Sequence, residues 1–248
     1  MTPWIFAYTA AVQSLRVLFL GFLLTVSASA EKNPVSTLRW TEGAANCTLR
    51  AGDDGHIYYG LSSLDFDVTV SVDRQELEKI PFRIVPMLSV ELSFHLKRSK
   101  ELEIAQNKFT LEFVKHFHVV ENALDPGEML KDIRTNMDDL TDEVEHHELK
   151  KHPDQKQQKE AQLQARLKEY TQMSDFIGAQ GMRPLVLTSA KSEASGWIFF
   201  NIKNRWIGPW RKPEEFILRL PIEEVRVEFP FQLPPKGRIT LMHRPGKS

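Results

Sequence analysis

The sequence predicts a mainly β protein, an antiparallel β-sandwich interrupted by one long antiparallel helical hairpin. Two observations lead to this prediction. Alternating apolar and polar residues, typical of strands with one buried and one solvated face, occur before residue 120 and after residue 183. Between them, apolar residues recur every three or four positions, as on one face of an amphipathic helix. We find no sequence repeat and no linker that would divide the chain into further domains.

Residues 1–30 are expected to be a signal peptide. They contain one charged side chain, Arg16, followed by the apolar run 17–26 and by small residues ending at Ala30. This is the tripartite signal pattern, and the run is shorter than the about 20 residues of a membrane span. We therefore expect cleavage near Ala30 and export, to the periplasm or the extracellular space, of a mature chain 31–248 without a membrane anchor. An uncleaved amino-terminal anchor is the alternative.

The charge balance and the cysteine count exclude several classes of protein. The formal net charge is −1, which gives no electrostatic footprint for nucleic acid or an anionic membrane. Cys47 is the only cysteine, so the core and not an intrachain disulfide must stabilise the exported chain. The sequence from Asn46 to Thr48 matches a glycosylation acceptor, which matters only in a eukaryotic secretory route.

The first half of the mature chain is predicted to form antiparallel strands. Residues 47–59 are expected to form a hairpin, because an Asp-Asp-Gly sequence inside this range is a turn signal. Alternating apolar residues predict two further strands over 64–72 and 88–96. A third run over 109–119 places five apolar side chains on one face: Phe109, Leu111, Phe113, Phe117 and Val119. Because Lys115 breaks this face, a bulge or a strand end is expected there.

The periodicity changes after residue 120. Asp125, followed by Pro126 and Glu128, is typical of a capped helix start. Two amphipathic stretches follow, separated by a His-Pro pair that a helix interior does not accommodate, and Gly178 is expected to end the second. Their stripes are Met129, Ile133, Met137, Leu140 and Val144, then Leu163, Leu167, Tyr170, Met173 and Ile177. Residues 126–178 are therefore predicted to be a helical hairpin inserted into the β-domain.

The charges of the two predicted helices differ in sign. Residues 128–148 contain eight acidic and two basic side chains, whereas residues 150–168 contain six basic and two acidic ones. An antiparallel pair sets acid against base, which selects the partner and the register. Each exposed ion pair contributes less than about 1 kcal/mol, so the pairing itself is a minor source of stability.

Strands are expected again after residue 183. Residues 197–202 are apolar on both faces, as in a central strand, whereas 216–220 and 225–231 alternate. We expect eight or nine strands in all, separated by turn signals, which favours a sandwich.

A short carboxy-terminal stretch carries the one resemblance to a known family. The sequence Ser-Gly-Trp-Ile-Phe-Phe at 195–200, with Phe-Ile-Leu at 216–218, resembles the last strands of immunoglobulin-like domains in exported bacterial proteins. The resemblance covers less than a fifth of the chain. It implies an immunoglobulin-like form of the sandwich and carries no functional motif, so it implies no site residue.

Three tryptophans are the candidate binding residues: Trp206, Trp210 and Trp197. They form the densest aromatic cluster of the chain. Exposed tryptophans on a β-sandwich can stack on sugar rings or on the apolar side chains of a partner. The alternative is structural, with Trp197 in the core and the other two covering one end of the sandwich.

No sequence signature of catalysis or of nucleotide binding is present, and no cofactor is expected. His116 and His118 are the weak metal-ligand candidates, because side chains two apart on a strand share a face. No third ligand is identifiable and Lys115 would repel a cation, so a solvated face is the alternative. His146 and His147 are adjacent on a predicted helix and do not share a face.

These observations predict an exported non-enzymatic protein whose β-domain is a scaffold and whose helical hairpin binds another cell-envelope or extracellular protein. The first alternative is a carbohydrate-binding module that uses exposed tryptophans. The second is a hydrolase or metal enzyme whose site is assembled from distant residues that a single sequence does not reveal. The oligomeric state and the identity of the partner are left open by the sequence.

Overall fold

The computed structural model describes residues 36–52, 56–72, 87–98, 101–201 and 214–233, and within them the chain is mainly β. The strands are β1 Ser36–Arg39, β2 Cys47–Ala51, β3 Ile57–Ser62, β4 Phe66–Val72, β5 Met87–Leu96, β6 Glu101–Ile104, β7 Thr110–Phe113, β8 Val119–Asn122, β9 Leu185–Thr188, β10 Glu193–Asn201, β11 Glu214–Ile222 and β12 Val225–Leu233. The helical segments are η1 Gln106–Lys108, α3 Pro126–Glu143, η2 Val144–Glu148, α4 Leu149–Lys151, η3 Pro153–Gln155 and α5 Lys156–Gln180. The expected signal peptide and the expected Asp-Asp-Gly turn lie outside the described residues.

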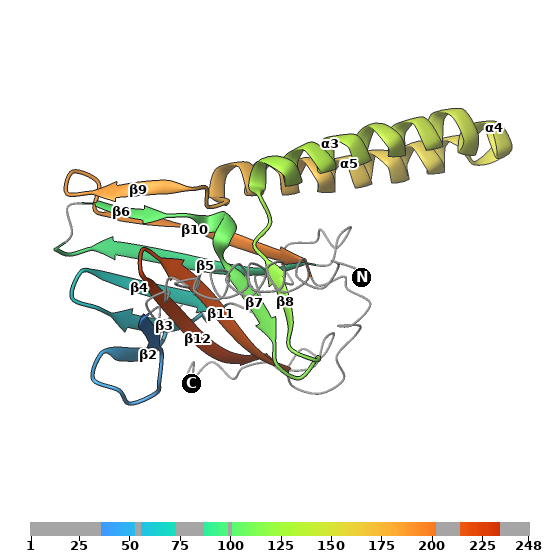
Figure 1. Cartoon of the computed structure of the whole chain (residues 1–248). Helices are drawn as coiled ribbons and strands as arrows, with labels where there is room; N and C mark the ends of the chain where they lie inside the picture. Colours follow the sequence, from blue (N-terminus) through green and yellow to red (C-terminus); the bar gives the residue numbers. More distant parts are fainter. Residues whose placement is uncertain (1–35, 53–55, 73–86, 99–100, 202–213, 234–248) are drawn as a thin grey trace, which may run out of the picture. The chain divides into compact units, whose positions relative to one another are not determined.

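The strands form two five-stranded sheets and one two-stranded sheet. Sheet A has the order β1-β12-β11-β7-β8, and sheet B has the order β10-β5-β4-β3-β2. Strands β6 and β9 form the two-stranded sheet. Neighbouring strands are antiparallel, as expected, except that β1 pairs with β12 in parallel. Because β2, β3, β4 and β5 are consecutive neighbours, sheet B contains a meander (Figure 1).

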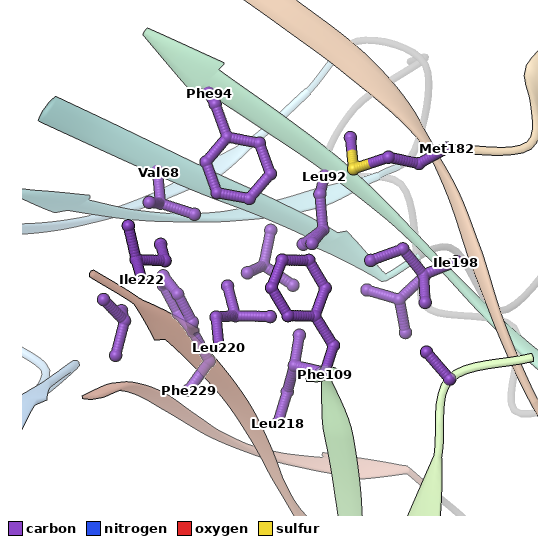
Figure 2. Packing of buried hydrophobic residues seen from close by; sticks show 14 of the residues in the cluster. Val68, Leu92, Phe94, Phe109, Met182, Ile198, Leu218, Leu220, Ile222 and Phe229 are labelled. Carbon is purple, nitrogen blue, oxygen red and sulfur yellow. The ribbon is translucent and has the colours of Figure 1, made fainter. Parts of the chain in front are cut away.

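Sheets A and B bury their apolar faces in one shared core. Strand β4 contributes Phe66, Val68 and Val70, all at most 4% exposed, and the intervening Asp67 and Thr69 lie on the other face. Figure 2 shows side chains of sheet B directed toward those of sheet A, from Val68, Leu92, Phe94 and Ile198 to Leu218, Leu220, Ile222 and Phe229. Each such side chain stabilises the fold by about 1.5–3 kcal/mol, so this core is the main source of stability.

The period-2 pattern located most strands but misplaced some ends. The antiparallel pairing of β2 with β3 confirms the strands of the expected 47–59 hairpin, from Cys47 opposite Leu61 to Ala51 opposite Ile57. The predicted strand 64–72 begins at Phe66, and Leu64 lies before it with 72% of its surface exposed. The position of Leu64 fits the apolar alternation of the strand, but its side chain is not buried with the others.

The run 109–119 is a hairpin and not one strand. Strand β7 ends at Phe113, the chain turns, and β8 begins at Val119 and pairs back antiparallel to β7. The amide of Val119 donates to the carbonyl of His116 at 3.1 Å across the turn, while Phe117 and His118 both have φ of 55°. Two residues with positive φ are typical of a type I′ turn, which joins two adjacent strands. The expected break at Lys115 is confirmed as a strand end.

Strand β10 is apolar on both faces because it has two different partners. Ile198 and Phe200 belong to the core between the sheets. Trp197 and Phe199 point the other way, into a second cluster formed with the helices. The apolar character of both faces is confirmed, with helices covering the second face, but the expected central position is wrong because β10 is an edge strand of sheet B.

Helices α3 and α5 lie side by side over much of their length (Figure 1). The chain passes between them through the π-helical turn η2, the short helix α4 and the 3-10 turn η3. The break occurs at His152 and Pro153, where the sequence predicted it. The sequence predicted that the second helix ends at Gly178, but α5 continues to Gln180 and is followed by Gly181.

Candidate interaction surface

Both ends of the α3–α5 pair are fixed to strand β10. Just before α3, the amide of Leu124 donates to the carbonyl of Phe199 at 2.8 Å. Just after α5, the amide of Met182 donates to the carbonyl of Trp197, also at 2.8 Å. The two acceptors are two residues apart on one strand, so the chain leaves the sheets and returns to them at almost the same place.

The local sequence explains this anchoring. Asp125 caps α3 by accepting a hydrogen bond from the amide of Glu128 at 3.0 Å, and Pro126 occupies the first turn as predicted. At the other end, a Cβ added to Gly181 would lie 2.5 Å from the carbonyl oxygen of Ile177 and 3.1 Å from Cβ of Pro126. Glycine therefore allows the end of α5 to approach the start of α3.

The first turns of α3 and the last turns of α5 pack on the outer face of β10. The ring of Phe176 lies edge-on to Trp197 and Phe199, with centroid distances of 5.7 and 6.2 Å. Other buried members of this cluster are Met129, Ile133, Tyr170, Met173 and Ile177. We call this part of the helices the base.

The remainder of the helices, which we call the arms, is far less buried. Within 141–166, all of it described, Leu163 is the one buried side chain, at 5% exposed. Val144 and Leu149 are half-buried. The predicted apolar stripe is therefore shared: its base residues pack on the sheet, and its arm residues pack within the helical pair.

The acidic side chains of the arm formed by α3 and η2 are mostly exposed and have few ion-pair partners. Among the described residues, the ion pair that joins the two arms is between Glu148 and Lys159, at 2.8 Å. The hydrogen bond from Lys159 lowers the pKa of Glu148. Several further acidic residues are exposed: Asp138, Asp139, Asp142, Glu143 and Glu145. The expected pairing of acid against base thus has one example there, and most of the acidic charge faces solvent.

The π-helical turn η2 contains His146 and His147, both exposed. Among the described residues, no group of three or more His, Cys, Asp or Glu side chains is arranged to hold a metal ion. Single π-helical turns occur frequently at functional sites, so the position of η2 between the two long helices is compatible with a functional role for the arms.

The tryptophans predicted to bind a ligand are only partly described. Trp197 is 8% exposed and is covered by the base, in agreement with the alternative that it belongs to the core. Trp206 and Trp210 lie outside the described residues. Their role in binding stays a prediction.

His116 and His118 do not share a strand face, which corrects the geometry expected from the sequence. Both lie in the β7–β8 turn, where the positive φ of His118 changes the direction of its side chain. Nδ1 of His116 is hydrogen-bonded to Glu214, and Nδ1 of His118 is hydrogen-bonded to Glu112. Because each histidine has its own carboxylate partner, the arrangement braces the turn.

A row of alternating charges crosses the outer face of sheet A, and the sequence did not reveal it. Arg219 of β11 binds Glu228 of β12 at 3.1 Å and Glu112 of β7, and Arg39 of β1 binds Glu228 at 2.8 Å. Burial raises the pKa of Glu112, but hydrogen bonds from His118 and Arg219 outweigh burial and hold that pKa below its usual value. The outward positions of these side chains follow from period 2, but their pairing depends on strand order.

The outer face of sheet B beyond the base has a shallow polar depression of about 410 Å³. Its polar lining comes from three adjacent strands: Asp67, Thr69, Ser93, His95, Glu193 and Ser195. Asp67 already binds Lys97 at 3.0 Å and His95 at 3.5 Å. The depression therefore offers hydroxyl and carboxylate groups. Phe94 is the one aromatic residue among its described lining, and its ring is buried in the core, so it offers no platform for a sugar ring.

Comparisons with protein-family models, with curated proteins and with solved structures found no match. Within the described part of the chain, no helix is long and apolar enough to cross a bilayer. A functional assignment therefore depends on the geometry of the chain itself.

Proposed function

We propose that this chain is an exported, non-enzymatic protein in which a β-sandwich is the scaffold and a helical hairpin binds a partner protein. The shared core of sheets A and B supports the sandwich. The side-by-side packing of α3 and α5, with both ends bonded to β10, supports the hairpin. The immunoglobulin-like strand order and cleavage near Ala30 stay predictions of the sequence.

One observation carries this proposal: the base of the helices is firmly packed, whereas the arms present long exposed faces. The arms bury one side chain within 141–166, so they contribute little to the stability of the protein. The β-scaffold is stabilised instead by the packing between the sheets. The exposed acidic charges of α3 would favour and steer association with a basic partner surface.

Site-specific photo-crosslinking tests the proposal in the cell that produces the protein. A photoreactive amino acid is introduced at Asp139 or Glu143 on the arms and, as a control, at Arg226 of β12 or Glu224 in the β11–β12 turn of sheet A; all four positions are exposed. We expect one discrete crosslinked product from the arm positions and none from the control positions. Crosslinks that form at the sheet A positions alone would contradict the proposal.

Carbohydrate binding is the second candidate, because the polar depression on sheet B offers several hydrogen-bonding groups. Sugar binding also requires an aromatic platform, the role that the sequence predicts for Trp206 and Trp210, which lie outside the described residues. Affinity electrophoresis in gels containing soluble polysaccharides separates the two candidates. Retardation that is lost on replacing both tryptophans with Ala would favour carbohydrate binding.

A further inference from the structure

A pocket of about 190 Å³ lies at the base of the helices, beside the ends of strands β5 and β10. Its apolar floor is formed by Met87, Leu124, Met129, Ile133 and Met173. Pockets for drug-sized ligands and cofactors are larger, about 300–1,000 Å³, so this volume suits one large apolar side chain. Three of the five floor residues are methionines, whose flexible and polarisable side chains adapt to different apolar partners.

The rim of the same pocket is acidic. Asp125, the N-cap residue of α3, lines it together with Glu128 and Asp132 from the first two turns of that helix. Lys131 lies 3.7 Å from Glu128, but both side chains are more than 70% exposed, so this pair neutralises little of the charge. Among the described residues Asp132 has no ion-pair partner in the structure. The pocket thus combines an apolar floor with a negative edge.

We propose that this pocket binds a basic amphipathic segment of the partner protein, with one apolar side chain on the methionine floor and Lys or Arg side chains at the acidic rim. The inference rests on the proposed function and names the chemistry of the partner. A helical segment with an apolar stripe and basic flanks presents both kinds of group at the spacing of a groove. The exposed acids farther along α3, such as Asp138 and Asp142, extend the negative field beyond the pocket.

The test uses fluorescence anisotropy with the full mature chain and a fluorescein-labelled synthetic peptide of Lys and Leu with one central Trp. In one control peptide Glu replaces each Lys, and in another Ser replaces each Leu and Trp. We expect binding of the first peptide and at least about tenfold weaker binding of both controls, because each control removes one of the two complementary features. If the Ser peptide binds as tightly as the first peptide, an apolar side chain is not needed for binding, and the proposal that this pocket binds one is wrong.

Two variants locate the site. Glu128→Lys combined with Asp132→Lys reverses the rim and is expected to weaken binding at least about tenfold. Asn136→Trp fills the pocket from its lining and is expected to weaken binding similarly while the charge stays unchanged. The matched control, Glu101→Lys combined with Glu103→Lys, makes the same charge change at exposed positions of β6, outside the helices. Thermal melting checks that each variant is folded.

The outcomes separate this inference from the proposed function. If the β6 control weakens binding as much as the rim variant, the attraction is a general charge effect and the pocket is not the site. If the peptide does not bind but the chain self-associates, and Asn136→Trp abolishes that association, a second copy occupies the pocket and the inference is wrong. Photo-crosslinking from Asp139 would still support the proposed function in either case.

Discussion

At the scale of single residues, buried charge and backbone conformation have the clearest consequences. Glu112 is 6% exposed and joins the β7–β8 turn to sheet A through His118 and Arg219. Hydrogen bonds to charged groups contribute about 1.5–3 kcal/mol, and a buried partner left unpaired costs a similar amount. The charged row on sheet A is therefore expected to stabilise the fold, and its contribution to the free energy of unfolding can be measured.

Glu112→Gln is expected to lower the free energy of unfolding by about 1–3 kcal/mol at neutral pH. The folded pKa of Glu112 lies below the unfolded value of about 4.3, so its stabilising contribution is present above that pH and is lost as pH falls through the folded pKa. Urea unfolding at pH 7 and pH 3 should therefore show a smaller difference between wild type and variant at the lower pH. Glu224→Gln, at an exposed position, is the control and should change little at either pH.

Phe117→Asn is expected to stabilise the protein by about 0.5–1 kcal/mol. Phe117 is 83% exposed and has φ of 55°, so the substitution loses little burial and places a residue that tolerates positive φ in the turn. Val119→Asn is the control: Val119 packs against the core, and its replacement should destabilise. Thermal denaturation that showed both substitutions to be destabilising would contradict the type I′ turn.

At the scale of elements, the end of α5 and the division between base and arms decide the behaviour of the helices. The predicted stop at Gly178 and the observed C-cap at Gly181 differ by three residues, slightly less than one helical turn. The difference has a steric origin, since a Cβ on Gly181 meets backbone and Pro126, whereas one on Gly178 meets nothing within 4 Å.

Gly181→Ala and Gly178→Ala are therefore expected to have opposite effects. Gly181→Ala should destabilise by about 1–3 kcal/mol, because the carbonyl of Ile177 cannot move away without disrupting the helix end. Gly178→Ala should stabilise by about 0.5–1 kcal/mol, because alanine is favoured inside a helix. Chemical denaturation measures both. Destabilisation by Gly178→Ala would show that α5 ends earlier than the structure has it.

Deletion of the arms and deletion of the whole helical pair should also differ. Replacing 142–166 with a short Gly/Ser loop is expected to leave the melting temperature almost unchanged and to reduce the helical circular dichroism, because base and core are untouched. Replacing 126–178 exposes Trp197 and Phe199, each worth about 1.5–3 kcal/mol, and is expected to lower the melting temperature strongly or to unfold the chain. Equal stability of the two deletion variants would show that the base does not support the sheets.

At the scale of the whole molecule, stability depends on the shared core and not on covalent crosslinks. Cys47 is the single cysteine of the chain, is half-buried, and accepts a weak hydrogen bond from the amide of Thr41 at 3.4 Å. Its environment is that of a packed side chain at the start of β2.

We therefore expect wild type and Cys47→Ser to have melting temperatures that are independent of reductant. No intrachain disulfide is available to be reduced, and serine can accept the same hydrogen bond. Differential scanning calorimetry with and without a reducing agent checks this. A large decrease for wild type in reducing conditions would indicate an intermolecular disulfide through Cys47.

The sequence by itself determined the mainly β class, the position of most strands and the two long helices. These features depend on local signals: period-2 alternation, the capped start at Asp125 and the proline at 153 all act within a few residues. The helices of the candidate site could also be predicted from the sequence, as two helical stretches of opposite net charge inserted between strands. Its anchoring on β10 was not, because Leu124 and Met182 bind Phe199 and Trp197 across the fold.

Only the tertiary structure decided which elements meet. Phe117 fits the alternation of a strand in the sequence, but the pairing of β7 with β8 places it in a turn. Trp197 was predicted to bind a ligand because it is aromatic and lies near other tryptophans, but in the structure it packs in a cluster with residues of α5. The Glu112–Arg219 pair follows from the order of β7 and β11 in sheet A, which no local pattern contains. The physical reason is that periodicity reports which face of an element is apolar, whereas burial and charge pairing depend on what packs against that face.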